Sequence, residues 1–353
     1  MSAVANLSQL DEFDEIIDVR TPSEFREDHI PGAVNLPVLL EEERARVGTI
    51  YKQVSSFEAK KVGASLIAQN IARHLDAYFS SKPKNWKPLV YCWRGGKRSG
   101  SMAHILGEVG WKTARLDGGY KAYRRQVIDD LETLPARFAF QVVCGPTGSG
   151  KSRLLQALHQ AGAQVLDLEQ LAQHRGSVLG NLPDAPQPAQ KMFDSLIWEQ
   201  LHGFDPAQPV YVEAESRKIG VLRVPEALIA RMWQSECVLV EVSAEQRVQL
   251  LKEEYAHFIA DPVALLAKVD CLKGLHSTEQ MAHWRDLAEH GAWDAFVLDL
   301  LLKHYDPAYR RSTLSHYPQL DRAQVLHPDD LSATAFRHLA QTFVPGAAAA
   351  IAP

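Results

Sequence analysis

One cysteine is followed by a loop that combines glycine with several cations. Cys92 precedes Trp93-Arg94-Gly95-Gly96-Lys97-Arg98, and a helical pattern begins soon afterwards. Backbone N–H groups in a loop that leads into a helix can surround an anion. Neighbouring cations favour the thiolate form of a cysteine, which is the nucleophilic form. We therefore expect catalysis by Cys92, Arg94 and Arg98, with Gly95 and Gly96 binding phosphate; the alternative is a buried core cysteine beside solvated arginines.

A second stretch, Gly145–Ser152, has the pattern G-x-x-x-x-G-K-S. It follows an apolar run at 138–144 and precedes a helical pattern, which is the strand–loop–helix context of a phosphate-binding P-loop. Amides of such a loop contact phosphate oxygens, the lysine adds a charge and the serine can hold a magnesium ion. The candidate phosphate-binding residues here are Gly145, Gly148, Gly150, Lys151 and Ser152.

Acidic residues end two later apolar runs. Asp167 lies in the predicted strand 164–169, and Glu213 and Glu215 lie in the predicted strand 209–218. The second of these has the place of the strand whose acidic residue assists a P-loop, although aspartate is usual there. We predict that these carboxylates hold a metal ion or face the Lys151 ammonium group. A solvated strand end remains the alternative.

Apolar runs of strand length alternate with helical patterns along the chain. Strands are predicted at 15–20, 88–91, 113–116, 138–144 and 236–242, and helices at 57–79, 189–201 and 278–302, with a break at 304–309. This alternation is typical of parallel sheets whose ligands bind at the carboxyl ends of strands. The predicted class is α/β: an N-terminal parallel sheet with helices on both faces, then a P-loop α/β domain with a helical extension.

Local signals mark the limits of these parts. Thr21–Glu24 has the N-cap, first-turn proline and capping-box glutamate of a helix start. The proline-marked stretch 132–137 is predicted to be a linker between a domain at 1–131 and a domain at 138–345. The alanine-rich stretch 346–353 is predicted to be a flexible tail.

The composition excludes several classes of protein. The chain has 353 residues, 46% hydrophobic and 23% charged, and its net charge of −5 gives no overall basic field for nucleic acid. Its four cysteines form no C-x-x-C pair, which argues against common zinc sites and a disulfide framework. No signal peptide or long apolar run is evident. We expect a cytoplasmic enzyme without membrane contact, whose oligomeric state stays open.

The N-terminal part resembles the rhodanese family. Asp18-Val19-Arg20, His29-Ile30-Pro31-Gly32-Ala33, the Cys92 loop and Leu116-Asp117-Gly118-Gly119 follow the order of that family. The resemblance implies that Cys92 carries a sulfur or selenium atom. Asp18, Arg20 and His29 occupy a strand end and a turn that need polar partners, so we predict structural roles for them.

The cysteine loop departs from the usual rhodanese loop in length. Arg98 lies six positions after Cys92, one more than usual, and this spacing is similar to that of cysteine-dependent protein phosphatases. We hypothesise that the longer loop fits a phosphate-sized donor such as selenophosphate. Deleting Gly96 should then harm the use of selenophosphate more than the use of thiosulfate.

The whole chain resembles the tRNA 2-selenouridine synthases, in which a rhodanese-like part precedes a P-loop. Further shared marks are Asp167-Leu168-Glu169, His174-Arg175-Gly176-Ser177, Glu215-Ser216-Arg217 and Tyr305-Asp306-Pro307, although Leu179 stands where an aromatic residue is expected. The resemblance implies replacement of the sulfur of 2-thiouridine, at the wobble position of tRNA, by selenium from selenophosphate. It also implies an S-geranylated intermediate made from geranyl diphosphate. No tightly bound cofactor is implied, and magnesium is a candidate ion.

An RNA substrate needs cations for its phosphates and aromatic surfaces for an extruded base. Ordinary solvated charges and packed rings remain the alternative for each candidate. The candidates for RNA contacts are Trp93, His174, Arg175, Arg217, Lys218 and Tyr305, followed by Arg223, Arg231, Arg310 and Arg311.

Other classes of protein stay open at this point. One is a thiosulfate sulfurtransferase fused to a nucleotide-dependent kinase, which would act without RNA. Another is a cysteine-dependent phosphatase, which would trap phosphate on Cys92. A third is a tRNA-binding scaffold with an inactive P-loop, which the intact Gly150, Lys151 and Ser152 disfavour.

Overall fold

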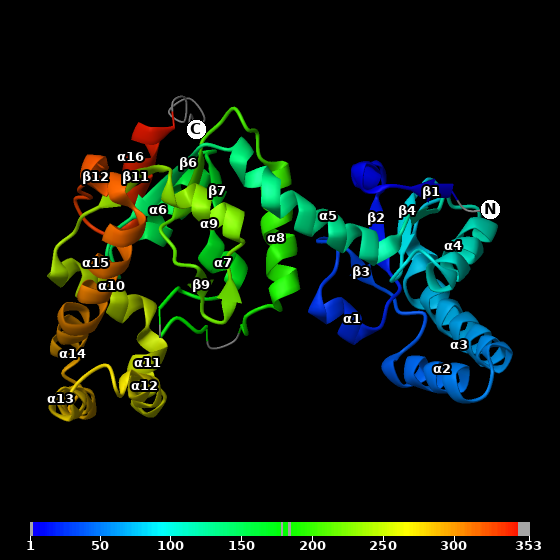
Figure 1. The fold of residues 1–353 in the computed structure, drawn as a ribbon, viewed down its shortest axis with the longest axis horizontal. Coiled ribbons are helices and arrows are strands. Elements are labelled where there is room, and N and C mark those ends of the chain that lie inside the picture. Colours follow the sequence, from blue (N-terminus) through cyan, green and yellow to red (C-terminus); the bar gives the residue numbers. More distant parts are fainter. Residues whose placement is uncertain (1–2, 178, 183–184, 345–353) are drawn as a thin grey trace. The chain divides into compact units, whose positions relative to one another are not determined.

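The computed structural model describes residues 3–177, 179–182 and 185–344. The chain forms two compact units (Figure 1). The first comprises residues up to Asp130 together with Pro188–Glu199, and the second comprises Leu131–Gln187 and the residues from Gln200 onward. The predicted tail at 346–353 lies outside the described residues.

The first unit is built on a parallel sheet. Within the described residues this sheet has five strands in the order β1-β5-β4-β2-β3. Its strands are β1 (Ala3–Ala5), β2 (Glu15–Asp18), β3 (Val34–Asn35), β4 (Pro88–Tyr91) and β5 (Ala114–Leu116). All four residues of β4 are buried, as expected for a central strand covered on both faces. Its carboxyl end leads directly to Cys92.

Helices cover this sheet. They are α1 (Pro22–Glu27), α2 (Glu41–Gln53), α3 (Ser56–Ala77), α4 (Lys97–Val109) and α5 (Gly119–Thr133). The predicted capping box is confirmed, because Thr21 and Glu24 exchange side-chain to backbone hydrogen bonds at the start of α1. Ile71 of α3 and Met102 of α4 belong to one buried cluster with Val90 of β4. The α4 helix, which follows the cysteine loop, is thereby fixed on the sheet.

The second unit contains another parallel sheet. In the part of the chain that the structure describes, its five strands have the order β12-β11-β6-β8-β7. They are β6 (Phe140–Cys144), β7 (Gln164–Leu166), β8 (Val210–Glu213), β11 (Glu236–Val240) and β12 (Gln324–Leu326), and a small antiparallel pair joins β9 (Lys218–Ile219) to β10 (Leu222–Arg223). The central β6 ends at Cys144, so the P-loop begins at the carboxyl edge of the sheet.

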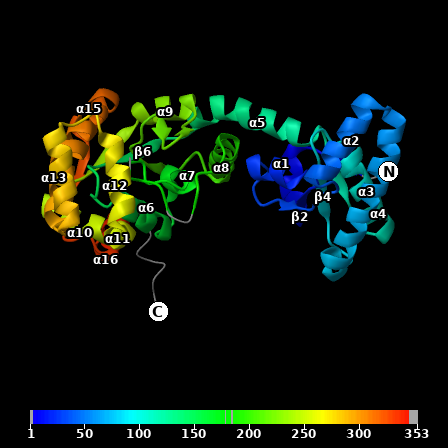
Figure 2. The same ribbon diagram turned by 90° about the horizontal axis from the view of Figure 1, so that it is seen from below.

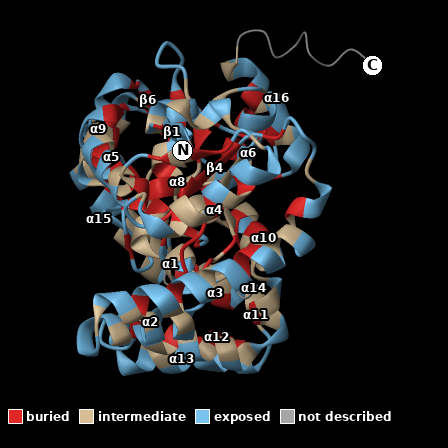
Figure 3. Cartoon of the chain, turned by 90° about the vertical axis from the view of Figure 1, so that its right-hand side faces the viewer, coloured by how far each residue is buried: buried red, intermediate tan, exposed pale blue. Residues whose placement is uncertain are grey.

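The helices of the second unit form two groups. One group comprises α6 (Lys151–Gln160), α7 (Leu168–Ala172), α9 (Glu226–Trp233), α10 (Ala244–Glu254), α15 (Asp306–His316) and α16 (Ala333–Phe343). The α8 helix (Gln190–Gly203) belongs to the first unit as far as Glu199. The other group comprises α11 (Ala256–Ala260), α12 (Pro262–Val269), α13 (Thr278–Glu289) and α14 (Trp293–Leu300). Figure 2 shows α11, α12 and α13 together at one end of this unit. In Figure 3 the buried residues follow the sheets, and the outward surfaces of the helices are exposed.

The predicted class, α/β with parallel sheets, is confirmed, whereas several local predictions are wrong. The strand predicted at 164–169 ends at Leu166, because the Asp167 side chain accepts a hydrogen bond from Gln170 N and caps α7. The helix predicted at 278–302 is interrupted between α13 and α14. No break occurs at 304–309, since a π-helical segment, Leu301–Tyr305, runs directly into α15.

Two further stretches contain elements that were not predicted from the sequence. The predicted linker at 132–137 is helical, because α5 extends to Thr133 and a 3-10 helix, Leu134–Arg137, follows it. The C-terminal region, expected to be mainly helical, also supplies β12. Among the described residues, no helix combines the length and the apolar character needed to cross a membrane.

Candidate functional site

The cysteine loop is closed against the first turn of α5. Cys92 is only 3% exposed, and its Sγ accepts a hydrogen bond from Ser99 Oγ at 3.2 Å. The carbonyl oxygens of Cys92 and Trp93 accept hydrogen bonds from the N–H groups of Tyr120 and Lys121 at 2.8 and 3.0 Å. The thiol therefore sits in a constrained loop with a hydroxyl donor directed at the sulfur. Ser99 was not among the predicted site residues.

Two glycines make this closure possible. Gly95 has a φ of +65°, and Gly119 has a φ of +58°, both in the left-handed region that favours glycine. A Cβ atom at Gly119 would lie 2.3 Å from the Cys92 carbonyl oxygen and 2.5 Å from Gly95 N. The family motif Leu116–Gly119 thus has a structural reason, which is close backbone approach to the cysteine loop.

The cations of the loop have different surroundings. Arg94 and Lys97 are exposed, and Arg98 is turned towards α1, where its guanidinium contacts Glu24 at 2.8 Å. Burial alone would raise the pKa of Glu24, but the hydrogen bond and charge of Arg98 lower it to about 2. Arg98 is therefore held by a carboxylate and is not free for an anion, whereas Arg94 and Lys97 can contact one.

A network of buried polar residues lies next to the cysteine loop and includes Tyr120, which bonds to it. Arg20 pairs with Asp18 at 2.6 Å, donates to the Asp28 carbonyl oxygen and lies over the Tyr120 ring. Burial opposes the charge of Arg20, yet its bond to Asp18 keeps its pKa above the ordinary value. The Asp28 carboxyl accepts hydrogen bonds from Tyr120 at 2.7 Å and from Ser195 at 2.8 Å. These contacts agree with the predicted structural roles of Asp18 and Arg20.

The P-loop has its lysine folded back onto the loop. Lys151 Nζ donates to the carbonyl oxygens of Gly145 at 2.9 Å and Pro146 at 3.4 Å. Gly148 and Gly150 have φ values of +79° and +85°, which only glycine adopts without strain. A Cβ atom at Gly150 would lie 2.4 Å from the Phe336 ring of α16. The fold therefore requires glycine at these two positions, and phosphate binding by them remains a prediction.

Three residues distant in sequence hold the P-loop by hydrogen bonds and an ion pair, and together are called the brace: Arg247, Asp306 and Tyr309. Arg247 is 5% exposed, donates to the Thr147 carbonyl oxygen at 2.8 Å and pairs with Asp306 at 2.6 Å. The Tyr309 hydroxyl oxygen accepts the N–H of Gly145 at 2.7 Å. The motif Tyr305-Asp306-Pro307 is thus linked to the P-loop through Arg247. The sequence marked this motif but gave no signal for Arg247 or Tyr309 as its partners.

The predicted acidic residues gather behind the P-loop and are joined by Glu169. Ser152 Oγ donates to Glu169 Oε2 at 3.4 Å, and Glu169 N donates to Glu213 Oε1 at 2.7 Å. Among the described residues, Glu213 Oε2 is buried without a hydrogen-bond partner. Burial, together with neighbouring carboxylates, raises the pKa of Glu213 and that of Glu215 well above the ordinary value. Burial also raises the pKa of Asp167.

These side chains would favour a cation next to the phosphate loop. Magnesium is commonly held by one or two carboxylates together with phosphate oxygens and water. The hydroxyl of Ser152 and the carboxyl of Glu169 are oxygen ligands of this kind at the start of α6, so the residues fit the ion. In the described part of the chain, no set of three or more His, Cys, Asp or Glu side chains forms a metal site of protein ligands alone.

A cavity of about 620 Å³ lies over the P-loop. Its lining combines predicted residues from several stretches of the chain: Lys151, Asp167, His174, Arg175, Glu215 and Tyr305. Arg175 is held there by a hydrogen bond to the Glu254 carbonyl oxygen at 2.8 Å and lies over the Tyr255 ring. His174 is 4% exposed, and burial lowers its pKa.

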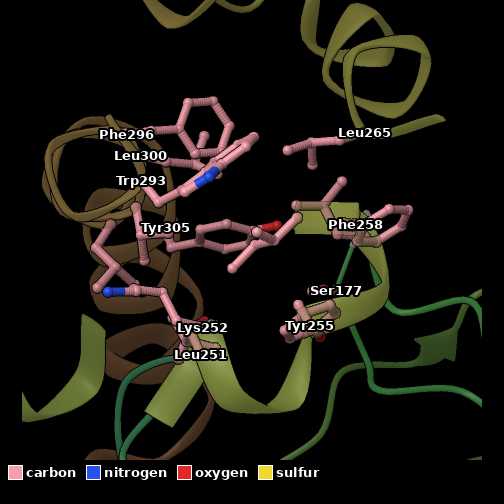
Figure 4. Close-up of a pocket in the computed structure, with 15 residues that line it drawn as sticks. Ser177, Leu251, Lys252, Tyr255, Phe258, Leu265, Trp293, Phe296, Leu300 and Tyr305 are labelled. Atoms are coloured by element: carbon pink, nitrogen blue, oxygen red, sulfur yellow. The ribbon is translucent and has the colours of Figure 1, made fainter. Parts of the chain in front are cut away.

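A narrow apolar pocket adjoins this cavity (Figure 4). The two share the residues Thr147, Ser177, Leu251, Tyr255 and Tyr305. The volume of this pocket, measured in the same way as that of the cavity, is about 60 Å³. A space of this size suits a slender chain better than a base or ring system. Its remaining lining is almost entirely aliphatic and aromatic and comes mainly from α10–α14. No local sequence pattern indicates this pocket, because its residues lie far apart along the chain.

The other candidates for RNA contacts have varied surroundings. Trp93 is 38% exposed and packs against the Tyr120 ring at a centroid distance of 5.2 Å. Arg217 pairs with Glu226 at 3.1 Å on the surface, and Lys218, Arg310 and Arg311 are exposed. Arg231 donates to the Phe138 carbonyl oxygen at 2.9 Å, which indicates a structural role.

Comparison with known proteins follows the same division of the chain. Residues 2–126 match the model of the rhodanese-like domain, and residues 138–266 match the model of the tRNA 2-selenouridine synthase AAA domain. A rhodanese-related protein of known structure from Thermoplasma volcanium is 16% identical and covers 35% of this chain and 92% of its own. Its TM-score of 0.23 is too low to support any conclusion.

Curated relatives extend over most of the chain. The tRNA 2-selenouridine synthase of Aeromonas salmonicida is 33% identical over 327 residues, which cover 83% of this chain and 86% of the relative. The enzyme of the same name from Nitrosomonas europaea is 36% identical over 244 residues, 68% of this chain but only 63% of the relative, so under two thirds of that protein is spanned. On the Aeromonas match and the two family models, the chain belongs to the tRNA 2-selenouridine synthase family.

Proposed function

We propose that this protein replaces the sulfur of 2-thiouridine, at the wobble position of tRNA, by selenium. The name of its relatives, tRNA 2-selenouridine synthase, supports the tRNA substrate and the product. The family resemblance supplies the donor, selenophosphate, and the S-geranylated intermediate. The two units then have separate chemistry, one at a thiol and one at a phosphate loop.

The first unit binds selenophosphate and positions its selenium. Cys92 positions the incoming selenium nucleophile, and Ser99 Oγ donates a hydrogen bond to the Cys92 sulfur and so helps to orient it. Arg94 and Lys97 are exposed beside the loop and available to the phosphate part of selenophosphate. At the base, the selenium of selenophosphate adds to C2 of the S-geranylated uridine, and the C2–S bond breaks so that geranylthiolate leaves. Water then cleaves the Se–P bond and releases phosphate, which leaves selenium alone on C2. Alkylation is what makes that sulfur a leaving group.

The second unit binds geranyl diphosphate and transfers its geranyl group to the tRNA. The sulfur of 2-thiouridine attacks the first carbon of the geranyl group, the bond from that carbon to the diphosphate oxygen breaks, and pyrophosphate leaves. Lys151 and the P-loop amides stabilise the negative charge that develops on pyrophosphate. A magnesium ion held by Ser152 and Glu169 would supply further charge there.

One observation carries this assignment of the P-loop. The apolar pocket shares the wall formed by Thr147, Leu251 and Tyr255 with the phosphate cavity. A ligand that joins a diphosphate to a slender hydrocarbon chain fills both spaces, whereas a nucleotide leaves the apolar pocket unused. Arg175 and Tyr305, which line the phosphate cavity, are proposed to contact the tRNA or the diphosphate.

Competition between ligands tests the assignment. We expect geranyl diphosphate to bind the full chain at least about 10-fold more tightly than pyrophosphate, since each buried methylene contributes about 0.8 kcal/mol. Lys151→Ala should abolish geranylation of a 2-thiouridine tRNA. The assignment fails if excess ATP readily displaces geranyl diphosphate and Lys151→Ala leaves geranylation intact.

A cysteine-dependent phosphatase is not favoured by the site. The Cys-x5-Arg spacing suggested it, but the Arg98 guanidinium is bound to Glu24 at 2.8 Å. No observation favours the fused sulfurtransferase and kinase over the proposed activity.

A further inference from the structure

The apolar pocket has an open end and a closed end. The open end is formed by residues that also line the phosphate cavity, among them Leu251 and Tyr255. In Figure 4 Leu265, Trp293 and Phe296 lie on the opposite side of the pocket from these two. A chain that enters from the phosphate side therefore meets these three side chains last.

The closed end is rigidly packed. Phe296 is 2% exposed and Leu265 is 4% exposed, and both belong to one core cluster with the fully buried Trp284. Trp293 packs edge-on against Phe296, with ring centroids 6.1 Å apart. Close-packed interiors resist the insertion of additional carbon atoms. The far wall can therefore act as a fixed stop.

One helix face supplies most of this wall. Trp293, Phe296, Val297 and Leu300 lie at the spacing that places side chains on one side of α14. Asp294, on the outer surface, pairs with Lys252 at the rim of the pocket. Polar groups are thus kept at the rim, and the interior is suited to hydrocarbon only.

We propose that the wall formed by Leu265, Trp293 and Phe296 limits the length of the prenyl chain that this protein accepts. The proposal rests on the proposed function, because it presumes that a prenyl diphosphate occupies the P-loop. A chain one isoprene unit longer than geranyl would have to displace the packed ring of Phe296. A shorter chain would leave the closed end unfilled and lose apolar contact.

Filling the pocket is the first test. Val297→Phe adds volume inside the pocket, whereas Leu298→Phe adds a similar ring to a half-buried neighbour on the same helix that does not line it. By calorimetry on the full chain, we expect Val297→Phe to weaken geranyl diphosphate binding by about 10- to 100-fold and to leave pyrophosphate binding within about twofold. Leu298→Phe should leave the affinity for both ligands close to that of the unsubstituted chain.

Enlarging the pocket is the second test. Phe296→Ala should raise the affinity for farnesyl diphosphate relative to geranyl diphosphate by about 10-fold or more. Leu272→Ala is the matched control, because Leu272 belongs to the same core cluster but does not line the pocket. In Leu272→Ala, the ratio of the affinity for farnesyl diphosphate to that for geranyl diphosphate should not change.

The outcomes separate the two proposals. If the unsubstituted chain binds geranyl diphosphate no better than pyrophosphate, the proposed function of the P-loop is wrong. If it binds geranyl diphosphate tightly but Val297→Phe and Leu298→Phe weaken it equally, the chain-length wall is wrong and the function stands. Should Phe296→Ala fail to fold, the Val297→Phe comparison alone decides.

Discussion

At the scale of single residues, local patterns predicted two centres, and the fold added partners that those patterns did not indicate. Cys92 and Lys151 were predicted from local patterns, because glycine and cation spacing depends on neighbouring residues only. Ser99, Arg247 and Tyr309 came to light only in the fold. Arg247 lies 100 residues from its carbonyl partner, Thr147, and no local pattern encodes such a pair.

Ser99 allows a direct test of the thiol's environment. Its hydroxyl donates a hydrogen bond to Cys92 Sγ and so holds the sulfur in one orientation. We expect Ser99→Ala to slow alkylation of Cys92 by iodoacetamide at pH 7 by about 10-fold, measured by mass spectrometry of the Cys92 peptide. Ser101→Ala is the control, since its hydroxyl bonds only to the Lys97 carbonyl oxygen in the same helix. Equal rates in the two variants would contradict this role.

At the scale of elements, the predicted strands that lead to Cys92 and to the P-loop are present, and the errors elsewhere have physical causes. The stretch 304–309, where a break was expected, contains Pro307, but this proline lies in the first turn of α15, where a helix tolerates it. The α2 helix was missed because it buries none of its residues and so shows no apolar stripe. β12 is short, and two of its three residues are exposed.

The contact between the cysteine loop and α5 predicts a sharp difference between two glycines. Gly119→Ala would place a Cβ atom 2.3 Å from the Cys92 carbonyl oxygen at a φ of +58°. Gly107 lies inside α4 with nothing within 4 Å of an added Cβ atom. We expect Gly119→Ala to destabilise the first unit by about 2 kcal/mol or more, and Gly107→Ala to stabilise it by about 0.5–1 kcal/mol. Urea unfolding checks both, and destabilisation by both would count against the packing described here.

The brace on the P-loop predicts both a stability and a binding effect. Arg247→Met leaves the Thr147 carbonyl oxygen and the Asp306 carboxylate without their cation. We expect a loss of about 3 kcal/mol in the free energy of unfolding and weaker pyrophosphate binding. Arg217→Met removes an exposed ion pair with Glu226 and should change stability by less than about 1 kcal/mol. A normal pyrophosphate affinity in Arg247→Met would show that the brace is not needed for the site.

At the scale of the whole molecule, the sequence indicated two sheets in the right order but not the course of the chain between the units. Pro188–Glu199 follows the P-loop in sequence yet clusters with the first unit. Ser195, in this segment, donates to the buried Asp28 carboxyl at 2.8 Å. Such a return of the chain depends on tertiary contacts that no periodicity reveals. The limits of independently folding domains remain a prediction.

The ion pair between Glu24 and Arg98 predicts how stability changes with pH. The pKa of Glu24 falls from its ordinary value of 4.5 to about 2 in the folded chain. Because the folded-state pKa is the lower one, the stabilisation is complete above about pH 4.5 and is lost as the pH falls towards 2. It amounts to about 3 kcal/mol at most.

Glu24→Gln should remove this pH dependence. We expect the variant to be less stable at pH 6 and to lose less stability than the unsubstituted chain between about pH 5 and pH 3. Urea unfolding, with limited proteolysis of the first unit as the readout, measures this difference in the loss of stability. Glu108→Gln is the control, because Glu108 is 75% exposed. A parallel loss of stability in Glu24→Gln and the unsubstituted chain would contradict the assignment.

In the proposed function, a thiol site and a diphosphate site divide one tRNA modification between them. Mass spectrometry of tRNA nucleosides, from cells that lack the gene and carry each variant, tests it most directly. Cells with the unsubstituted chain should contain 2-selenouridine, cells with Cys92→Ala should accumulate S-geranyl-2-thiouridine without selenouridine, and cells with Lys151→Ala should contain neither. Normal selenouridine in either variant, or nucleosides unaffected by the presence of the gene, would contradict the account.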